Sequence, residues 1–95
     1  MTLILRPLAK LDIQLAAQYI ADRNPDAARA WRRTILATAR RLAEMPGMGH
    51  LVEGRADGVR MFCKDGYLIF YRVLFGDIEI LRVIHGARDW GRLFR

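Results

Sequence analysis

The side chains best suited to chemistry stand where the last apolar run of the chain ends. His85 can act as a general acid or base, and Arg88 can hold a phosphate. A histidine at a strand end is more often a hydrogen-bonded structural residue, however, and Arg88 can simply pair with the adjacent Asp89. The segment is therefore either part of a nuclease site or a last core strand followed by a tail that binds another protein.

The rest of the sequence offers little that could hold a metal or a cofactor. His50 and Cys63 together make no metal-binding pattern. Neither a glycine-rich phosphate loop nor a Ser/His/Asp arrangement is visible. We therefore expect no metal and no cofactor.

Length and composition restrict the class of protein. The 95 residues allow one domain, 1–95, and an apolar content of 53% is enough for a packed core. No apolar run approaches the roughly 20 residues of a membrane-spanning helix, and the N-terminal stretch is too short for a signal peptide. One cysteine excludes an internal disulfide and fits a reducing compartment. We expect a cytoplasmic protein without a membrane partner.

The charge of the chain indicates an anionic partner. Sixteen basic residues against ten acidic ones give a net charge of +6, and all the basic residues except Lys10 and Lys64 are arginines. Arginine-favouring codons would explain this without any partner. Arginine also makes forked contacts to carboxylates and phosphates, so an acidic protein and a nucleic acid both remain possible partners.

The first half of the chain predicts a strand and two helices. Thr2 to Leu5 is strand-like, and Pro7 is suited to open a helix. The spacing of this helix defines an apolar stripe, which normally faces the core. Asn24 and Pro25 begin a second helix that runs to about Met45. The first stripe is Leu8, Leu11, Leu15 and Tyr19, broadened by Ile13, Ala16, Ala17 and Ile20; the inward line of the second helix is Ala28, Trp31, Ile35, Ala39 and Leu42.

The second half predicts three antiparallel strands. Asp65-Gly66 and Gly76-Asp77 separate the apolar runs and fit two-residue hairpin turns. The fold class is therefore α+β, with an N-terminal strand, an antiparallel two-helix hairpin and a three-stranded antiparallel meander.

Counting from these turns predicts the register and the two faces of the sheet. Tyr71 lies opposite Arg82, where the guanidinium can stack on the ring, and Arg60 lies opposite Tyr71. Both faces are mostly apolar, but the helical hairpin can cover only one. The other face would then be exposed and would mark a partner site, with dimerisation as the alternative. We place Met61, Leu68, Phe70, Leu81 and Val83 on that face.

Five stretches taken in order resemble a known family. "YIADRNPDAARAW", "LAEMPGMG", "VRMF", "YLIFYRV" and "IEILRVIHGARD" are similar to the ParE branch of the RelE/ParE toxins of bacterial toxin–antitoxin pairs. The resemblance spans Leu11 to Asp89 and implies the fold predicted above. RelE-type members are ribosome-dependent mRNA endonucleases, whereas the characterised ParE-type toxins act on DNA gyrase.

The resemblance favours the ParE branch when this sequence is compared with the catalytic positions of the RelE-type nucleases. Aligned by the hairpin turns, four of the positions at which those nucleases place cations carry none here, and Phe94 near the C-terminus has no hydroxyl. Only Arg88 matches the nuclease pattern, with His85 as a possible acid or base. Apolar groups cannot stabilise the charge that develops on a cleaved phosphodiester. The positions without a cation are Val59, Met61, Cys63 and Leu68.

The resemblance thus implies a non-catalytic toxin that inhibits DNA gyrase and is neutralised by a ParD-like antitoxin, which itself dimerises and binds operator DNA. We expect an acid-bearing amphipathic antitoxin segment to cover the apolar face and to meet Arg29, Arg33, Arg40 or Arg60. The alternatives are a ribosome-dependent endonuclease using His85 and Arg88, and a nucleic-acid-binding module using the arginine face. Direct sequence-specific nucleic-acid binding is not expected. The expected target contacts are Arg88, Trp90, Arg92, Leu93 and Phe94.

Overall fold

A five-stranded sheet carries two long helices on one side in the computed structural model, which describes residues 2–55, 57–88 and 90–93. The strand order is β1-β5-β4-β3-β2, with β1 parallel to β5 and the remaining pairs antiparallel. The predicted α+β class is confirmed. The short edge strand β2 was not predicted. The elements are β1 (Thr2–Leu5), α1 (Pro7–Ala21), α2 (Pro25–Glu44), the 3₁₀ helix η1 (Pro46–Met48), β2 (His50–Leu51), β3 (Arg60–Lys64), β4 (Tyr67–Leu74), β5 (Asp77–His85) and α3 (Trp90–Leu93).

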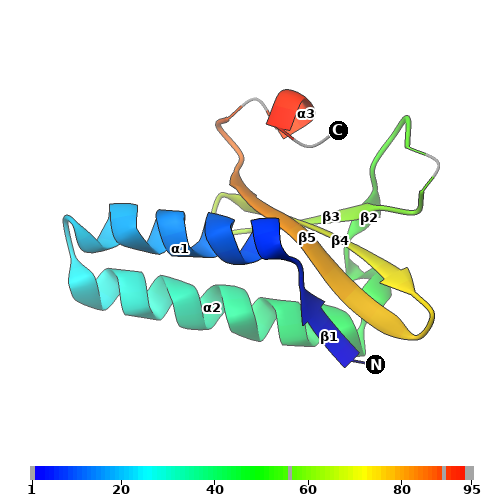
Figure 1. The fold of residues 1–95 in the computed structure, drawn as a ribbon, viewed down its shortest axis with the longest axis horizontal. Coiled ribbons are helices and arrows are strands. Elements are labelled where there is room, and N and C mark those ends of the chain that lie inside the picture. The colour runs from blue at the N-terminus through cyan, green and yellow to red at the C-terminus, as the bar shows by residue number, and fades with distance from the viewer. Residues whose placement is uncertain (1, 56, 89, 94–95) are drawn as a thin grey trace.

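The helices α1 and α2 form the predicted hairpin and lie together along the sheet (Figure 1). Pro7 and Pro25 occupy the first helical positions, where the missing amide hydrogen costs nothing. The side chain of Asn24 accepts a hydrogen bond from the backbone N–H of Ala27 at 3.1 Å and so caps α2. No helix among the described residues is long and apolar enough to cross a membrane.

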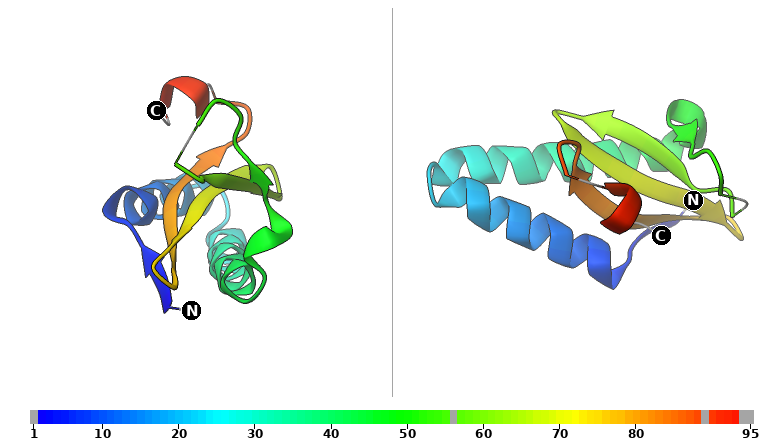
Figure 2. Two further views of the ribbon diagram at one scale, coloured as in Figure 1. Left: turned by 90° about the vertical axis from the view of Figure 1, so that its right-hand side faces the viewer. Right: turned by 90° about the horizontal axis from the view of Figure 1, so that it is seen from above.

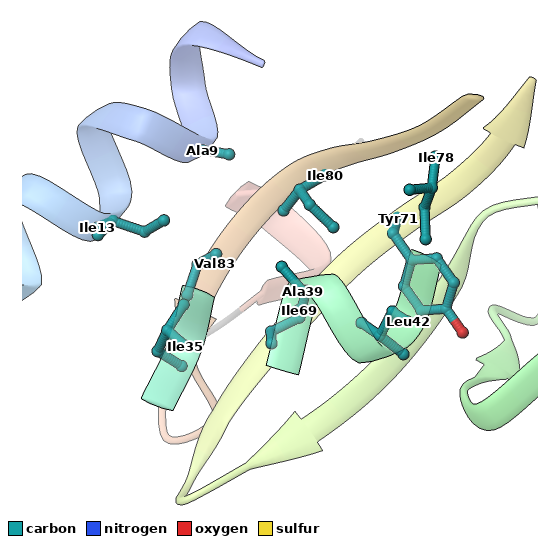
Figure 3. Close-up of a cluster of buried hydrophobic side chains, with 10 residues drawn as sticks. All are labelled: Ala9, Ile13, Ile35, Ala39, Leu42, Ile69, Tyr71, Ile78, Ile80 and Val83. Carbon is teal, nitrogen blue, oxygen red and sulfur yellow. The ribbon is translucent and has the colours of Figure 1, made fainter. Parts of the chain in front are cut away.

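The main core lies between the helical hairpin and the sheet (Figure 3). The inward line predicted for α2 is confirmed, because Ile35, Ala39 and Leu42 are buried there. Facing them is the sheet's Tyr71, whose hydroxyl donates to Pro46 O at 2.7 Å and accepts from Gly49 N at 2.8 Å. A Cβ at Gly49 would stand 2.5 Å from that hydroxyl, so the loop after α2 needs glycine here.

The turn between β4 and β5 differs from the prediction. Its central residues are Phe75 and Gly76, both with positive φ, and Leu74 pairs with Asp77. This arrangement puts glycine at the second position, as in the confirmed Asp65-Gly66 turn.

A β-bulge then shifts the register along β5. Tyr71 pairs with Ile80 and Phe70 with Arg82, so Leu81 is the extra residue. The predicted pairing of Tyr71 with Arg82 is therefore wrong, whereas that of Tyr71 with Arg60 is confirmed. The shift also moves Val83 to the face that packs against the helices, opposite to its predicted position.

The second face of the sheet is closed rather than exposed, so that prediction is wrong. It carries a cluster of buried residues, with Phe70 fully buried and Leu68 only 8% exposed. Val52, in the segment between β2 and β3, and Trp90 of α3 pack against this cluster. Figure 2 shows that segment and α3 on the side of the sheet away from α1 and α2. The remaining members of the cluster are Val59 and Ile84, with Met61 and Leu81 half-buried beside them.

Candidate protein-binding site

The outer side of α1 is an exposed apolar ridge, which we define as Leu8, Leu11, Leu15 and Tyr19. Their exposed fractions are 55%, 46%, 55% and 62%. The predicted orientation of this helix is wrong, because these are the residues that were expected to face the core. Its buried residues are Ala9 and Ile13 instead. Ala9 and Ile13 pack into the core, and the leucines on the other side of the helix point away from it.

A groove of about 420 Å³ runs between the ridge and the end of β5. Leu15 and Tyr19 of the ridge form one wall, and His85 and Arg88 lie at the C-terminal end of β5. The groove is lined mainly by apolar and aromatic side chains, as small binding sites usually are. Its other lining residues are Asp12, Ala16, Tyr67, Val83 and Ile84.

Asp12 anchors α1 to β5 on one side of this groove. Its carboxylate accepts two hydrogen bonds from Arg82, at 2.7 and 2.9 Å, and one from the backbone N–H of Val83 at 2.9 Å. The hydrogen bonds from Arg82 to Asp12 raise the pKa of Arg82 above its ordinary value. A carboxylate in this arrangement is not free to act as a base or to meet a ligand. The predicted stacking of Arg82 on Tyr71 is replaced by this ion pair.

Aromatic rings are in contact at one end of the groove and behind it. His85 meets the Tyr67 ring edge-on at 5.0 Å between centroids, and Tyr67 lies 4.9 Å from Trp31 of α2. His85 Nδ1 accepts a hydrogen bond from the backbone N–H of Ala87 at 3.1 Å, so this nitrogen is already occupied. Burial, and secondarily the neighbouring Tyr19, raises the pKa of Tyr67 above its ordinary value.

The structure does not bring the two nuclease candidates together with the other positions of the nuclease pattern. His85 and Arg88 line the groove beside α1, whereas Met61 and Leu68 belong to the cluster on the opposite face of the sheet. Among the described residues that line the groove, Arg88 is the only arginine. A phosphorane needs more positive charge than this groove presents. The described part of the chain also holds no group of three or more His, Cys, Asp or Glu residues that could bind a metal.

The arginines expected to meet an antitoxin fall into two groups. Arg33 and Arg40 are exposed on α2, and the exposed Arg29 forms an ion pair with Asp26 one turn away. Arg60 is half-buried, and its guanidinium donates to Gly49 O at 2.8 Å, so it holds the loop after α2. The first group remains accessible to a partner, whereas Arg60 has a structural role.

The expected apolar contacts are mostly inaccessible in this state. Phe70 and Val83 are buried, 0% and 3% exposed, and Leu68 is 8% exposed. Met61 and Leu81 are half-buried. A partner could reach this face only by displacing the segments that cover it.

The C-terminal residues expected to contact the target also differ in exposure. Arg88 and Arg92 are exposed, whereas the Trp90 ring folds back over Phe70 at a centroid distance of 5.4 Å. Leu93 ends α3, and neither its side chain nor Phe94 belongs to the described part of the structure.

The ridge on α1 was not predicted as an exposed surface. The alternative apolar line, Ala9, Ile13, Ala16 and Ile20, was present in the sequence and could have indicated it.

Comparison with known proteins shows which family and which solved structure this chain is similar to. The family model "ParE toxin of type II toxin-antitoxin system, parDE" matches residues 3–90. Toxin ParE1 of Caulobacter vibrioides is 35% identical over 82 residues, which cover 85% of this chain and 84% of that protein. A chain of a chromosomal ParDE TA system from P. aeruginosa superimposes with a TM-score of 0.75 at 22% identity, covering 90% of this chain and 95% of that one. This last similarity shows the shared fold.

Proposed function

We propose a function from one premise: the chain belongs to the ParE toxins of type II toxin–antitoxin systems. We propose that this toxin acts in the cytoplasm by binding a protein and not by cleaving a bond. Its target is DNA gyrase, so that replication stops when the toxin is free. A ParD-like antitoxin neutralises it by forming a hetero-oligomer, and the antitoxin supplies the contact to operator DNA.

The observation that supports binding over cleavage is the separation of the polar groups. His85 and Arg88 stand in a largely apolar groove, and the carboxylate of Asp12, which also lines it, is held by Arg82. General acid–base cleavage of RNA needs an acid, a base and cations around one phosphate. The geometry therefore favours adhesion over the ribosome-dependent endonuclease.

The arginines proposed for these contacts are exposed. Arg88 and Arg92 present free positive charge near the C-terminus and are proposed to meet the target, together with Trp90, Leu93 and Phe94. The antitoxin carboxylates are proposed to meet Arg29, Arg33 and Arg40 of α2. Both assignments use arginine's forked donors, which match carboxylates.

Inducible expression with and without the open reading frame adjacent to the toxin gene tests this function. We expect growth arrest that the neighbour relieves, with transcripts of unchanged length. Arrest accompanied by cuts within codons, abolished by Arg88→Ala, would establish the endonuclease instead. Binding of the purified toxin to nucleic acid, falling steeply with salt, would indicate the nucleic-acid-binding module.

Truncation after Asp89 tests the target assignment separately. The shortened toxin should lose toxicity while still binding the antitoxin. Because Trp90 covers part of the sheet, the thermal midpoint must be measured in parallel to exclude unfolding. If the shortened protein still halts growth at equal abundance, the C-terminal segment is not the target contact.

A further inference from the structure

We propose that the tip of the β4–β5 hairpin, formed by Leu74 and Phe75, is an anchor that inserts into an apolar pocket on the target enzyme. The inference rests on the proposed function, in which that enzyme is DNA gyrase, and adds a contact which that function does not include. Figure 1 shows the tip at the end of the sheet away from α3. Along β5 it lies about 27 Å from His85, at about 3.4 Å per residue, so it is separate from the groove and from the C-terminal contacts.

The two hairpin turns of this chain share one backbone geometry but not one kind of residue. The φ angles are 51° and 82° at Asp65 and Gly66, and 51° and 81° at Phe75 and Gly76. Positive φ at both central residues is the type I′ arrangement, which prefers asparagine or aspartate followed by glycine. Asp65 follows that preference, whereas a bulky residue is uncommon there because its Cβ crowds the following carbonyl oxygen. The β4–β5 turn therefore carries a phenylalanine that its backbone disfavours.

Packing within the chain does not account for this phenylalanine. The side chain of Phe75 is 96% exposed, and the adjacent Leu74 and Val73 are 38% and 43% exposed. A side chain that costs backbone strain and gains almost nothing from burial points to a role outside the fold. Aromatic side chains that fill a pocket at the centre of an interface carry much of its affinity. The exposure and the backbone of Phe75 thus both favour a binding contact.

The charges of the hairpin end select its partner. Residues 72–79 carry one arginine and two acidic residues, a net charge of −1 in a chain of +6. Arg72 is paired with Glu79 at 3.3 Å. The tip therefore offers no free cation to an acid-bearing antitoxin segment or to the phosphates of a nucleic acid. A second copy of this chain is also disfavoured, because the +6 on each copy opposes association.

A folded enzyme with an apolar pocket complements the tip. The paired strands β4 and β5 hold the turn, so the Phe75 ring is presented in one place and little freedom is lost when a pocket encloses it. A segment that becomes ordered only on binding has no such pocket ready. The tip and the C-terminal contacts lie at opposite ends of β5, so the target would contact both ends of this strand.

The test replaces Phe75 by the residue type that its backbone prefers. Phe75→Asn gives the Asn-Gly pair favoured in type I′ turns, so the midpoint of urea denaturation should rise or stay unchanged. The matched control Leu51→Thr removes an apolar side chain that is 60% exposed but lies on β2. For the wild type and both variants, two quantities are measured: the half-inhibitory concentration for purified gyrase and the dissociation constant for the purified product of the adjacent open reading frame.

We expect Phe75→Asn to raise the half-inhibitory concentration about 30-fold, the loss typical of a central aromatic anchor. Leu51→Thr should stay within about threefold of the wild type, and both variants should bind the antitoxin as the wild type does. Unchanged inhibition by Phe75→Asn, or an equal loss in the control, would overturn the inference. So would a lower urea midpoint for Phe75→Asn, because it would show that Phe75 stabilises the fold.

Two other outcomes would assign the tip to a different occupant and so contradict the inference. Weaker antitoxin binding by Phe75→Asn with unchanged gyrase inhibition would make the tip an antitoxin contact. A wild-type dimer in sedimentation that Phe75→Asn dissociates would make the tip a contact between copies of this chain.

Failure of the proposed function is read from the wild type. A wild-type chain that neither arrests growth nor inhibits gyrase contradicts that function, and the anchor with it. A wild-type chain that does both, with Phe75→Asn equally active, contradicts the anchor alone. Growth arrest without gyrase inhibition removes gyrase as the target; relief of that arrest by Phe75→Asn at equal abundance would then support the anchor, and undiminished arrest would overturn it.

A labelling measurement covers the case in which Phe75→Asn fails to fold. In the Cys63→Ser background, Val73→Cys places one exposed thiol beside the intact tip, and Leu51→Cys places one on β2. We expect saturating gyrase to slow maleimide labelling about tenfold at position 73 and to leave position 51 unchanged. Equal labelling at position 73 with and without gyrase would contradict insertion of the tip.

Discussion

The two long helices differ in where most of their large apolar side chains lie. Helix α2 turns its large residues, such as Ile35 and Leu42, into the core and its arginines to the outside. Helix α1 buries the small Ala9 together with Ile13 and leaves its leucines outside. An apolar stripe therefore identifies an amphipathic helix. It does not show which side of the helix meets the core when the other side also carries small apolar residues.

The helices are also fastened differently. Asp12 holds α1 to β5 through Arg82 and the Val83 backbone, whereas Tyr71 holds the loop after α2 through Pro46 and Gly49. The polar anchor of each helix is thus buried or half-buried, and its outer face is free to differ.

The largest expected effect contrasts truncation of a leucine on each helix. Leu42→Ala should cost about 2–5 kcal/mol of unfolding free energy, because it leaves a cavity in the core. Leu15→Ala should change it by less than about 0.5 kcal/mol, since this side chain is half exposed. Urea denaturation of both variants measures the difference. Similar costs would mean that the ridge is buried in solution and that the comparison of the helices is wrong.

Breaking the anchor of α1 should have the next largest effect. Asp12→Ala leaves Arg82 without its carboxylate, and the Arg82 side chain is only 17% exposed. We expect a loss of about 3 kcal/mol of unfolding free energy. The double variant Asp12→Ala/Arg82→Met should recover part of that loss, because it also removes the half-buried cation that the Asp12 carboxylate contacts. No recovery in the double variant would show that the ion pair is not the source of the cost.

The anchor after α2 should be weaker and should respond to pH. Tyr71→Phe removes two hydrogen bonds and should cost about 1–2 kcal/mol of unfolding free energy at neutral pH. Burial raises the pKa of Tyr71, while the bond from Gly49 and the charge of Arg60 lower it by less.

The sign of the pH effect follows from that raised pKa. The contribution of Tyr71 is complete below its ordinary pKa of about 10 and is lost as the pH rises through the raised folded-state value. Denaturation between pH 8 and pH 11 should therefore show a steeper loss for the wild type than for Tyr71→Phe. Parallel curves for the two proteins would exclude this account of Tyr71.

The smallest effect is expected on the outer face of α2. Arg33→Gln/Arg40→Gln should weaken antitoxin binding by only about two- to fivefold, because exposed charges are hydrated and screened. The difference from the wild type should shrink further as salt is raised, which titration calorimetry at two ionic strengths would detect. A loss greater than about tenfold, or one that higher salt does not reduce, would contradict this account of α2.

The sequence predicts the elements of this fold well because their signals are local. Pro7, Asn24 and Pro25 mark helix starts, and Asp65-Gly66 marks a turn, through the backbone geometry that each residue favours. The errors arise where the outcome depends on distant contacts. The bulge at Leu81 shifts one strand against another, and no local pattern near Leu81 announces it.

The candidate site was less predictable for the same reason. Covering of Phe70 by Trp90 depends on a tail that folds back across the sheet, and either fate for that tryptophan was compatible with its sequence. Exposure of Leu11 and Leu15 depends on how closely α1 approaches β5. The lack of cations at the aligned nuclease positions was easier to predict, because it is visible in the residue types alone.

Supercoiling by purified DNA gyrase, measured with increasing toxin and with or without antitoxin, tests adhesion to the target most directly. We predict inhibition that saturates with toxin, that antitoxin reverses, and that occurs in a reaction containing neither ribosomes nor RNA. Unimpaired supercoiling at a toxin excess, with mRNA cleaved in a ribosome-containing reaction, would contradict the account.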